Sequence, residues 1–188
     1  MLPVPKDWSD LSPAWMSAAL RRQHPGLVVG DVRVGEVEHG TNSRARVALS
    51  LSEGEGPSSV FVKGRGKPSH RLALLALGAL ATEAQLADAG ASFPLTHPIF
   101  YAGGVDWWRA ATVVVSEDVV ASGGRPYDAG TPLTLEAVRS GLDGLAALHA
   151  AHWDRPVGSA LRRLRPWRLS SMWNPVSVAS LARGMRRA

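Results

Sequence analysis

The sequence predicts an α+β fold, in which a five-stranded antiparallel sheet with packed helices precedes a glycine-rich linker and a further helix. Three observations support this class. They are short segments in which apolar and polar residues alternate, an Ala/Leu-rich segment after the third of these, and two more apolar segments beyond it. We expect residues 103–106 to form the turn between the last two strands. The expected strands span residues 28–37, 45–51, 59–63, 99–102 and 110–116.

The helices are predicted from capping residues and glycines. Ser12, which a proline follows, is a suitable N-cap for a helix that precedes the first strand. The Ala/Leu-rich segment 69–88 is predicted as helix, with Ser69 as its cap and Gly90 as its terminator. Gly78 lies inside this segment, and we expect it to divide the helix in two.

The chain is expected to divide into two parts after the last strand. Residues 122–126 are rich in glycine, end in proline and form the predicted linker. Thr134 then caps a helix that runs to about Trp153, with leucines along one face. The predicted domains are residues 1–120, which hold the sheet, and residues 121–188, which hold the linker and the helical remainder.

Composition narrows the function classes. The 188 residues include no cysteine, which excludes disulfides, thiolate metal sites and thiol nucleophiles. No signal peptide and no apolar run of membrane-spanning length is present, so we expect a cytoplasmic protein without a membrane partner. The net charge of +5 comes from residues 155–188, which hold eight arginines and no acid. Thirteen of the 21 basic and all 16 acidic residues lie in 1–154, a net charge of −3, so the high pI says nothing about the partners of the main body. The arginine tail could bind nucleic acid or another anion, but we expect it instead to be a C-lobe fragment without its acidic partners, so a nucleic-acid partner is not expected.

The predicted strand 59–63 ends in Lys63, one of only three lysines in a chain that otherwise takes its positive charge from arginine. Glu83 follows 20 residues later, in the next predicted helix, and a helix packed on the sheet could aim its carboxylate at this lysine. The alternatives are a strand that runs out into a basic turn and a glutamate that is solvated on its helix.

Two further segments carry polar groups at the ends of predicted strands. Gly40-Thr41-Asn42-Ser43 joins the first two strands and can form a phosphate-covering loop, because glycine lets the backbone approach and amides and hydroxyls donate to oxygen. An ordinary hairpin turn favours the same residues. The buried strand 113–115 leads into Ser116-Glu117-Asp118-Val119, whose backbone can receive a flat base, or which is simply a polar strand end.

The order of these features resembles the N-terminal lobe of a kinase: a glycine loop, a strand-ending lysine, a helix glutamate, two strands and a crossing segment. The chain is similar to the aminoglycoside phosphotransferase/choline kinase-like group, in particular its ecdysteroid-kinase-like branch and related bacterial branches. The resemblance covers residues 10–155. Its motifs are Gly40-Thr41-Asn42-Ser43, Val60-Phe61-Val62-Lys63, Thr82-Glu83-Ala84, Val115-Ser116-Glu117-Asp118-Val119 and the Leu-His-Ala…Trp segment 145–153.

The resemblance implies a kinase that transfers the γ-phosphoryl group of ATP to a hydroxyl of a small molecule, with Mg²⁺ as the metal. It implies that Lys63 contacts the α- and β-phosphates and that Glu83 orients it. It also implies that Gly40, Thr41, Asn42 and Ser43 cover the phosphates. The backbone of Ser116, Glu117, Asp118 and Val119 would receive adenine.

The catalytic loop of this family, H-G-D-x-x-x-x-N, has no match in the sequence. His152-Trp153-Asp154 has the H-x-D form, but Ser159 stands where the asparagine should be, and no acid follows Asp154. His149 and His152 could form a metal pair only with a third ligand, so we expect His149 to pack or hydrogen-bond in the helix interface instead. We therefore expect a kinase-like N-lobe with a truncated helical C-lobe, which binds nucleotide and is inactive alone. The alternative is a degenerate kinase-like binding module without catalysis.

Overall fold

The computed structural model describes residues 2–64, 66–90, 93–127 and 130–154. The helices in these ranges are η1 (Trp8–Asp10), α1 (Pro13–Leu20), α2 (Pro68–Ala76), α3 (Thr82–Ala89) and α4 (Leu135–His152). The strands are β1 (Val28–Val34), β2 (Glu38–His39), β3 (Ser43–Glu53), β4 (Ser59–Gly64), β5 (Phe100–Asp106) and β6 (Ala111–Glu117). The predicted α+β class is confirmed.

The strands form one antiparallel sheet in the order β1-β3-β4-β6-β5, and the short β2 pairs with the start of β3. All five predicted strands are present. β2 is an addition that the sequence did not reveal, because two residues are too few to show a strand period. After β4 the chain passes through α2 and α3 to the edge strand β5, and then returns to the middle of the sheet as β6.

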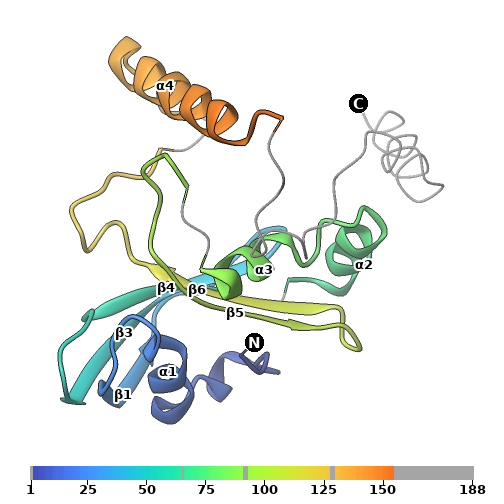
Figure 1. Cartoon of the computed structure of the whole chain (residues 1–188). Coiled ribbons are helices and arrows are strands. Elements are labelled where there is room, and N and C mark those ends of the chain that lie inside the picture. The colour runs from blue at the N-terminus through green and yellow to red at the C-terminus, as the bar shows by residue number, and fades with distance from the viewer. Residues whose placement is uncertain (1, 65, 91–92, 128–129, 155–188) are drawn as a thin grey trace.

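A helix covers each face of the sheet. The fully buried Met16 and Leu20 of α1 pack with Val62 and other strand residues in the main apolar core. On the opposite face, the buried Ala84 of α3 packs against Val114. Figure 1 shows α1 and α3 on opposite sides of the sheet. Successive side chains of a strand alternate between two differently lined faces, so the register decides which polar groups meet.

The starts of α1 and α2 differ in how they are capped. Ser12 Oγ accepts a hydrogen bond of 3.2 Å from the N–H of Trp15, which confirms the predicted cap of α1. The prediction that Ser69 caps α2 is wrong, because Lys67 is the N-cap residue and the helix already begins at Pro68. Proline in the first helical position has its φ preset and no N–H to satisfy, so α2 starts without a side-chain cap.

Two glycines limit α2 and α3. Gly78, with φ of +70°, separates the two helices, and Gly90, with φ of +61°, follows the last residue of α3. Both lie in the left-handed region, which glycine enters without steric cost. The predicted division of this helical segment and its predicted end are confirmed.

The predicted turn between the last two strands is wrong. Residues 103–106 belong to β5, and the turn lies at residues 107–110. A Cβ atom on Gly103 would collide with the carbonyl oxygen of Ala84 in α3. The glycine at this position therefore serves the close approach of helix and strand, and not a change of chain direction.

Helix α4 confirms the predicted cap and span, since Thr134 Oγ1 accepts a hydrogen bond of 3.1 Å from the N–H of Ala137. It lies apart from the sheet (Figure 1), and its leucine face is exposed, with Leu135 at 69% and Leu142 at 60%. No helix in the described ranges combines the length and the apolar character needed to cross a bilayer. The arginine-rich tail and the rest of the predicted second domain, residues 155–188, lie outside the described residues.

Candidate functional site

The register of three central strands aligns two rows of side chains on the α3 face of the sheet. Arg44 of β3 is paired with Lys63 of β4, and Arg46 is paired with Phe61. Phe61 is in turn paired with Ser116 of β6. The neighbouring residues in β3 and β4 point to the α1 core, so these five side chains share the opposite face.

Lys63 and Glu83 form an ion pair across the interface between sheet and helix. Lys63 Nζ donates a hydrogen bond of 2.5 Å to Glu83 Oε1, and the two side chains are 36% and 39% exposed. Glu83 lies in the first turn of α3, which Ala84 and Ala87 anchor against the sheet. The geometric part of the sequence prediction, that these two groups face each other, is confirmed.

Two more ion pairs lie on the same face. Arg44 Nε is 2.8 Å from Glu38 Oε2, and both side chains are more than half exposed. Arg46 Nε is 3.3 Å from Asp118 Oδ1. Each of the three basic side chains is therefore held by one carboxylate, while other donors of the two guanidinium groups stay available.

Asp118 is 5% exposed and is fixed by its neighbours. Its Oδ2 accepts a hydrogen bond of 3.0 Å from Ser59 Oγ, and its Oδ1 accepts one of 3.2 Å from the N–H of Val120. A buried carboxylate needs such partners to offset the loss of its hydration. Asp118 therefore fixes the start of the segment that leaves β6 and sets the position of the Arg46 guanidinium.

The segment that follows β6 forms the rear wall. The side chain of Glu117 is held in place, because it accepts hydrogen bonds from the N–H of Ile99 (3.1 Å) and the hydroxyl of Ser122 (2.6 Å). The carbonyl of Val119 accepts a hydrogen bond of 2.6 Å from the N–H of Gly124, whereas the N–H of Val119 donates none within the described residues. This wall thus presents one backbone donor that a ligand can use.

These groups line one cleft of about 640 Å³. This volume lies within the usual range for small-molecule sites. The lining combines the three ion pairs, the rear wall and aromatic rings: Glu38, Arg44, Arg46, Phe61, Lys63, Glu83, Pro98, Phe100, Ser116, Glu117, Asp118, Val119, Val120, Pro126 and Tyr127. Of the predicted site residues, the structure brings Lys63, Glu83, Ser116, Glu117, Asp118 and Val119 together here.

The structure does not bring Gly40, Thr41, Asn42 and Ser43 into this cleft. Glu38 and His39 pair with Arg44 and Ser43, so the segment is the tip of a hairpin. The tip contacts the first turn of α2, where the carbonyl oxygen of Gly40 is 3.2 Å from His70 Nδ1. The Ser43 hydroxyl points to the α1 face, because it alternates with Arg44 along β3, and it lies 3.0 Å from His39 Nδ1.

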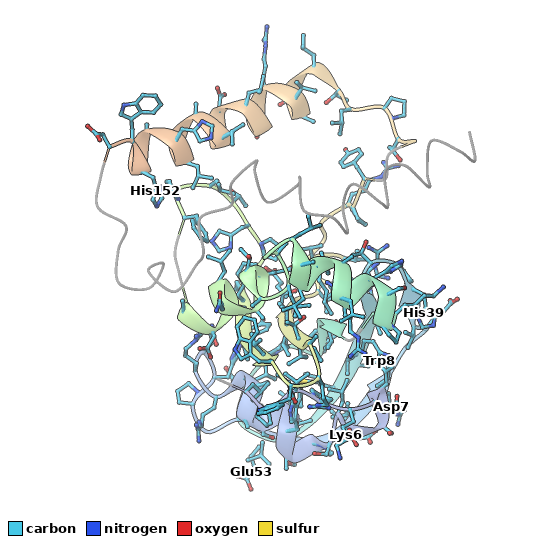
Figure 2. All side chains as sticks on the ribbon, turned by 90° about the vertical axis from the view of Figure 1, so that its right-hand side faces the viewer. Lys6, Asp7, Trp8, His39, Glu53 and His152 are labelled. Atoms are coloured by element: carbon cyan, nitrogen blue, oxygen red, sulfur yellow. The ribbon has the colours of Figure 1, made fainter. Side chains whose placement is uncertain are left out.

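The histidines and the acid at the end of α4 are remote from the cleft. His149, His152 and Asp154 line a separate hollow with Phe93, and His152 Nδ1 lies 2.9 Å from the carbonyl oxygen of Leu148. Figure 2 shows His152 on α4, well separated from the labelled residues of the sheet domain. Within the described ranges, no group of three potential metal-binding side chains occurs.

Glu38, Arg44 and Arg46 are site residues that the sequence reasoning missed. A signal was present, because both arginines alternate with the apolar residues of the strand and so face away from its core. Their alignment with Lys63 depends on the register of β3 and β4, which alternation within one strand does not fix.

No protein-family model, curated protein or solved structure matches the chain. The cleft brings together three basic side chains, each paired with a carboxylate, one backbone donor and aromatic walls. Such a set suits a ligand with an anionic end and a flat polar ring.

Proposed function

We propose that this chain is the nucleotide-binding part of a kinase-like phosphotransferase of the aminoglycoside phosphotransferase/choline kinase-like group. The reaction is transfer of the γ-phosphoryl group of ATP to a hydroxyl of a small molecule, in the cytoplasm. The observation that supports this proposal is the Lys63–Glu83 ion pair, at 2.5 Å, in a cleft whose rear wall is the segment leaving β6. A strand lysine held by a helix glutamate is the arrangement with which kinases position phosphates.

The residues of the cleft suit the two ends of ATP. Lys63 and Arg44 are adjacent in the sheet register and supply positive charge for phosphate oxygens. The free N–H of Val119 supplies a donor for a ring nitrogen of the base. Phe61 lines the cleft one row behind Lys63 and provides an apolar surface for the base.

The residues do not fit the metal ion that the family uses. Magnesium takes oxygen ligands from carboxylates as well as from phosphates. Glu83 and Asp118 are already engaged with Lys63 and Arg46, and no cluster of metal-binding side chains occurs in the described residues. Within the described residues, no side chain is therefore assigned as a metal ligand or as a catalytic residue.

Calorimetry with ATP tests the proposal. We expect saturable binding by residues 1–188, weakened at least tenfold, which is about 1.4 kcal/mol, in Lys63→Met. Lys67→Met is the matched control, because Lys67 lies four residues further on and does not line the cleft, so its ATP affinity should equal that of the parent chain. Absence of saturable binding, or equal affinities of the two variants, would contradict the proposal.

Turnover separates the proposal from its alternatives. A degenerate binding module would also bind ATP and lose affinity in Lys63→Met, so binding alone does not distinguish it. We expect no substrate-dependent ADP release by residues 1–188. A robust release that disappears in Asp154→Ala would instead place catalysis within this chain, at the end of α4.

A further inference from the structure

A second cavity, of about 430 Å³, lies on the α1 face of the sheet, opposite the Lys63–Glu83 cleft. It is lined by the N-terminal segment 4–8, by His39 of β2 and residues of β3, β4 and β6, and by the segment 66–67 that precedes α2. Figure 2 shows Lys6, Asp7, Trp8 and His39, all of which line it, along one flank of the molecule. The two sites share no residue, so this cavity is independent of the function proposed above.

The floor of the cavity consists of core residues. Leu11, Val62 and Val113 line it and are 5%, 1% and 1% exposed. Protein interiors are packed to the density of organic crystals, with few voids larger than a water molecule. These three side chains are already packed in the core and close the base of the cavity, so the apolar surface open to a ligand has to come from the neighbouring aromatic wall.

An aromatic ring forms one wall and gives the cavity its shape. The six-membered ring of Trp8 lies against Gly64 of β4, where a Cβ atom would be 3.6 Å from ring carbons Cη2 and Cζ2. The backbone around Trp8 is fixed, because Asp7 Oδ1 accepts its N–H at 2.7 Å and Asp10 Oδ2 accepts the N–H of Lys6 at 2.7 Å. Asp10 Oδ2 also accepts the N–H of Asp7 at 3.1 Å, and the hydrogen bonds from the backbone N–H groups of Asp7 and then Lys6 hold the pKa of Asp10 below the usual 3.8. The ring is thus a pre-positioned surface for a planar group.

The rim is basic and polar. Lys6 comes from the N-terminal segment and Lys67 from the start of α2, and Lys67 forms no ion pair with any described residue. The Ser43 hydroxyl, in a residue only 6% exposed, adds a hydrogen-bonding group. Asp7 is the acidic lining residue, and its carboxylate is engaged with the N–H of Trp8. The Lys67 ammonium near the Trp8 ring favours an anionic group on a planar apolar body.

We propose that this cavity is a binding site for a small planar aromatic carboxylate. The ring system lies beside the Trp8 ring, above the base that Leu11, Val62 and Val113 close, and the carboxylate meets the ammonium of Lys67. A neutral ligand of the same shape loses the charge-assisted contact, and a small anion without rings loses the contact with Trp8.

Calorimetry with 2-naphthoate, on the full chain, tests this site. We expect one saturable site, with naphthalene-2-carboxamide binding at least fivefold more weakly. Lys67→Met should lower the affinity for 2-naphthoate by a similar factor and leave the affinity for the carboxamide unchanged. Trp8→Leu should lower the affinity for both ligands at least tenfold. The matched control Trp108→Leu replaces a fully exposed tryptophan outside the cavity and should change neither affinity.

Three results would overturn the proposal: no saturable binding, equal affinities for the carboxylate and the carboxamide, or displacement of 2-naphthoate by ATP. The last would place the ligand in the Lys63 cleft. Lys63→Met should leave 2-naphthoate binding intact, so that failure here and failure of the proposed nucleotide site remain distinguishable. If Trp8→Leu fails to fold, the exposed Lys67→Met variant and the carboxamide comparison still decide the question.

Discussion

Lys63 Nζ and Glu83 Oε1 lie 2.5 Å apart, although 20 positions separate the two residues in the chain. The contact joins the middle of the sheet to the first turn of α3. It depends on the packing of Ala84 and Ala87 on the sheet, which sets the position of the helix. The ion pair therefore couples the placement of α3 to the position of the ammonium group in the cleft.

Glu83→Ala should weaken ATP binding more than it weakens the fold. Without the carboxylate, the Lys63 ammonium loses the partner that orients it, and we expect about a tenfold loss of ATP affinity, or about 1.4 kcal/mol. Because both side chains are more than one third exposed, the free energy of unfolding should change by at most about 1 kcal/mol. Calorimetry and urea denaturation measure the two effects separately.

The matched control for this variant is Glu136→Ala. Glu136 occupies the first turn of α4, as Glu83 occupies the first turn of α3, and it lies outside the cleft. Its replacement should leave ATP affinity unchanged. A loss of affinity in both variants would mean that net charge, and not the orientation of Lys63, explains the effect.

Gly103→Ala should destabilise the fold, because the added Cβ would collide with the carbonyl oxygen of Ala84 and force α3 away from β5. We expect a loss of about 1–3 kcal/mol in the free energy of unfolding. Gly141→Ala is the control, since no atom lies within 4 Å of its Cβ and the residue is in helix α4, so we expect a gain of up to about 1 kcal/mol. Urea denaturation compares them, and equal changes would contradict the close-approach argument.

The fold could be predicted because strands and helix starts depend on local signals. Alternation located the strands, and Ser12 and Thr134 located two helix starts. The ion pair, whose partners lie 20 positions apart, was expected from the order of a strand-ending lysine and a glutamate in the following helix, and not from a local signal. The short connections of an antiparallel meander then leave few alternative arrangements.

The remaining features depend on contacts between distant segments. Glycine is typical of turns, and only the proximity of α3 explains why Gly103 lies in a strand. Serine is typical of loops, yet the register of β3 turns the Ser43 hydroxyl away from Lys63. The ion pair between Arg46 and Asp118 could not be predicted either, because it depends on where the chain leaves β6. No periodicity within one segment records such contacts.

The ion pair of Asp106 and Arg109 should make part of the stability depend on acidic pH. Hydrogen bonds from the backbone N–H and then the side chain of Arg109 lower the pKa of Asp106 from the usual 3.8. A lowered pKa in the folded state means that the carboxylate stabilises the fold above pH 3.8, and that this contribution is lost as the pH falls through the folded-state pKa. The difference in unfolding free energy between the parent chain and Asp106→Asn should therefore be constant above about pH 5 and shrink below pH 4. Denaturation series at several pH values measure it, and a constant difference down to pH 2 would contradict the argument.

Arg22 should contribute more to stability than other exposed arginines, because its guanidinium group joins two backbone carbonyls at the end of α3 to one at the start of β5. Its Nη1 donates to Asp88 (2.6 Å), and its Nη2 donates to Ala87 (2.8 Å) and Phe100 (3.0 Å). The last carbonyls of a helix lack partners in the helix, and a cation there also interacts favourably with the helix dipole.

Arg22→Ala should therefore cost about 2–3 kcal/mol of unfolding free energy, since hydrogen bonds to a charged group contribute about 1.5–3 kcal/mol. Arg33→Ala is the matched control, because its ion pair with Asp31 is 82% and 53% exposed and should contribute less than about 1 kcal/mol. The loss in Arg22→Ala should be accompanied by faster amide hydrogen exchange in α3 while exchange in β3 stays unchanged, because the end of the helix is released locally. Equal stability of the two variants, or an increase in exchange that extends evenly over the sheet, would show that Arg22 does not hold α3 in place.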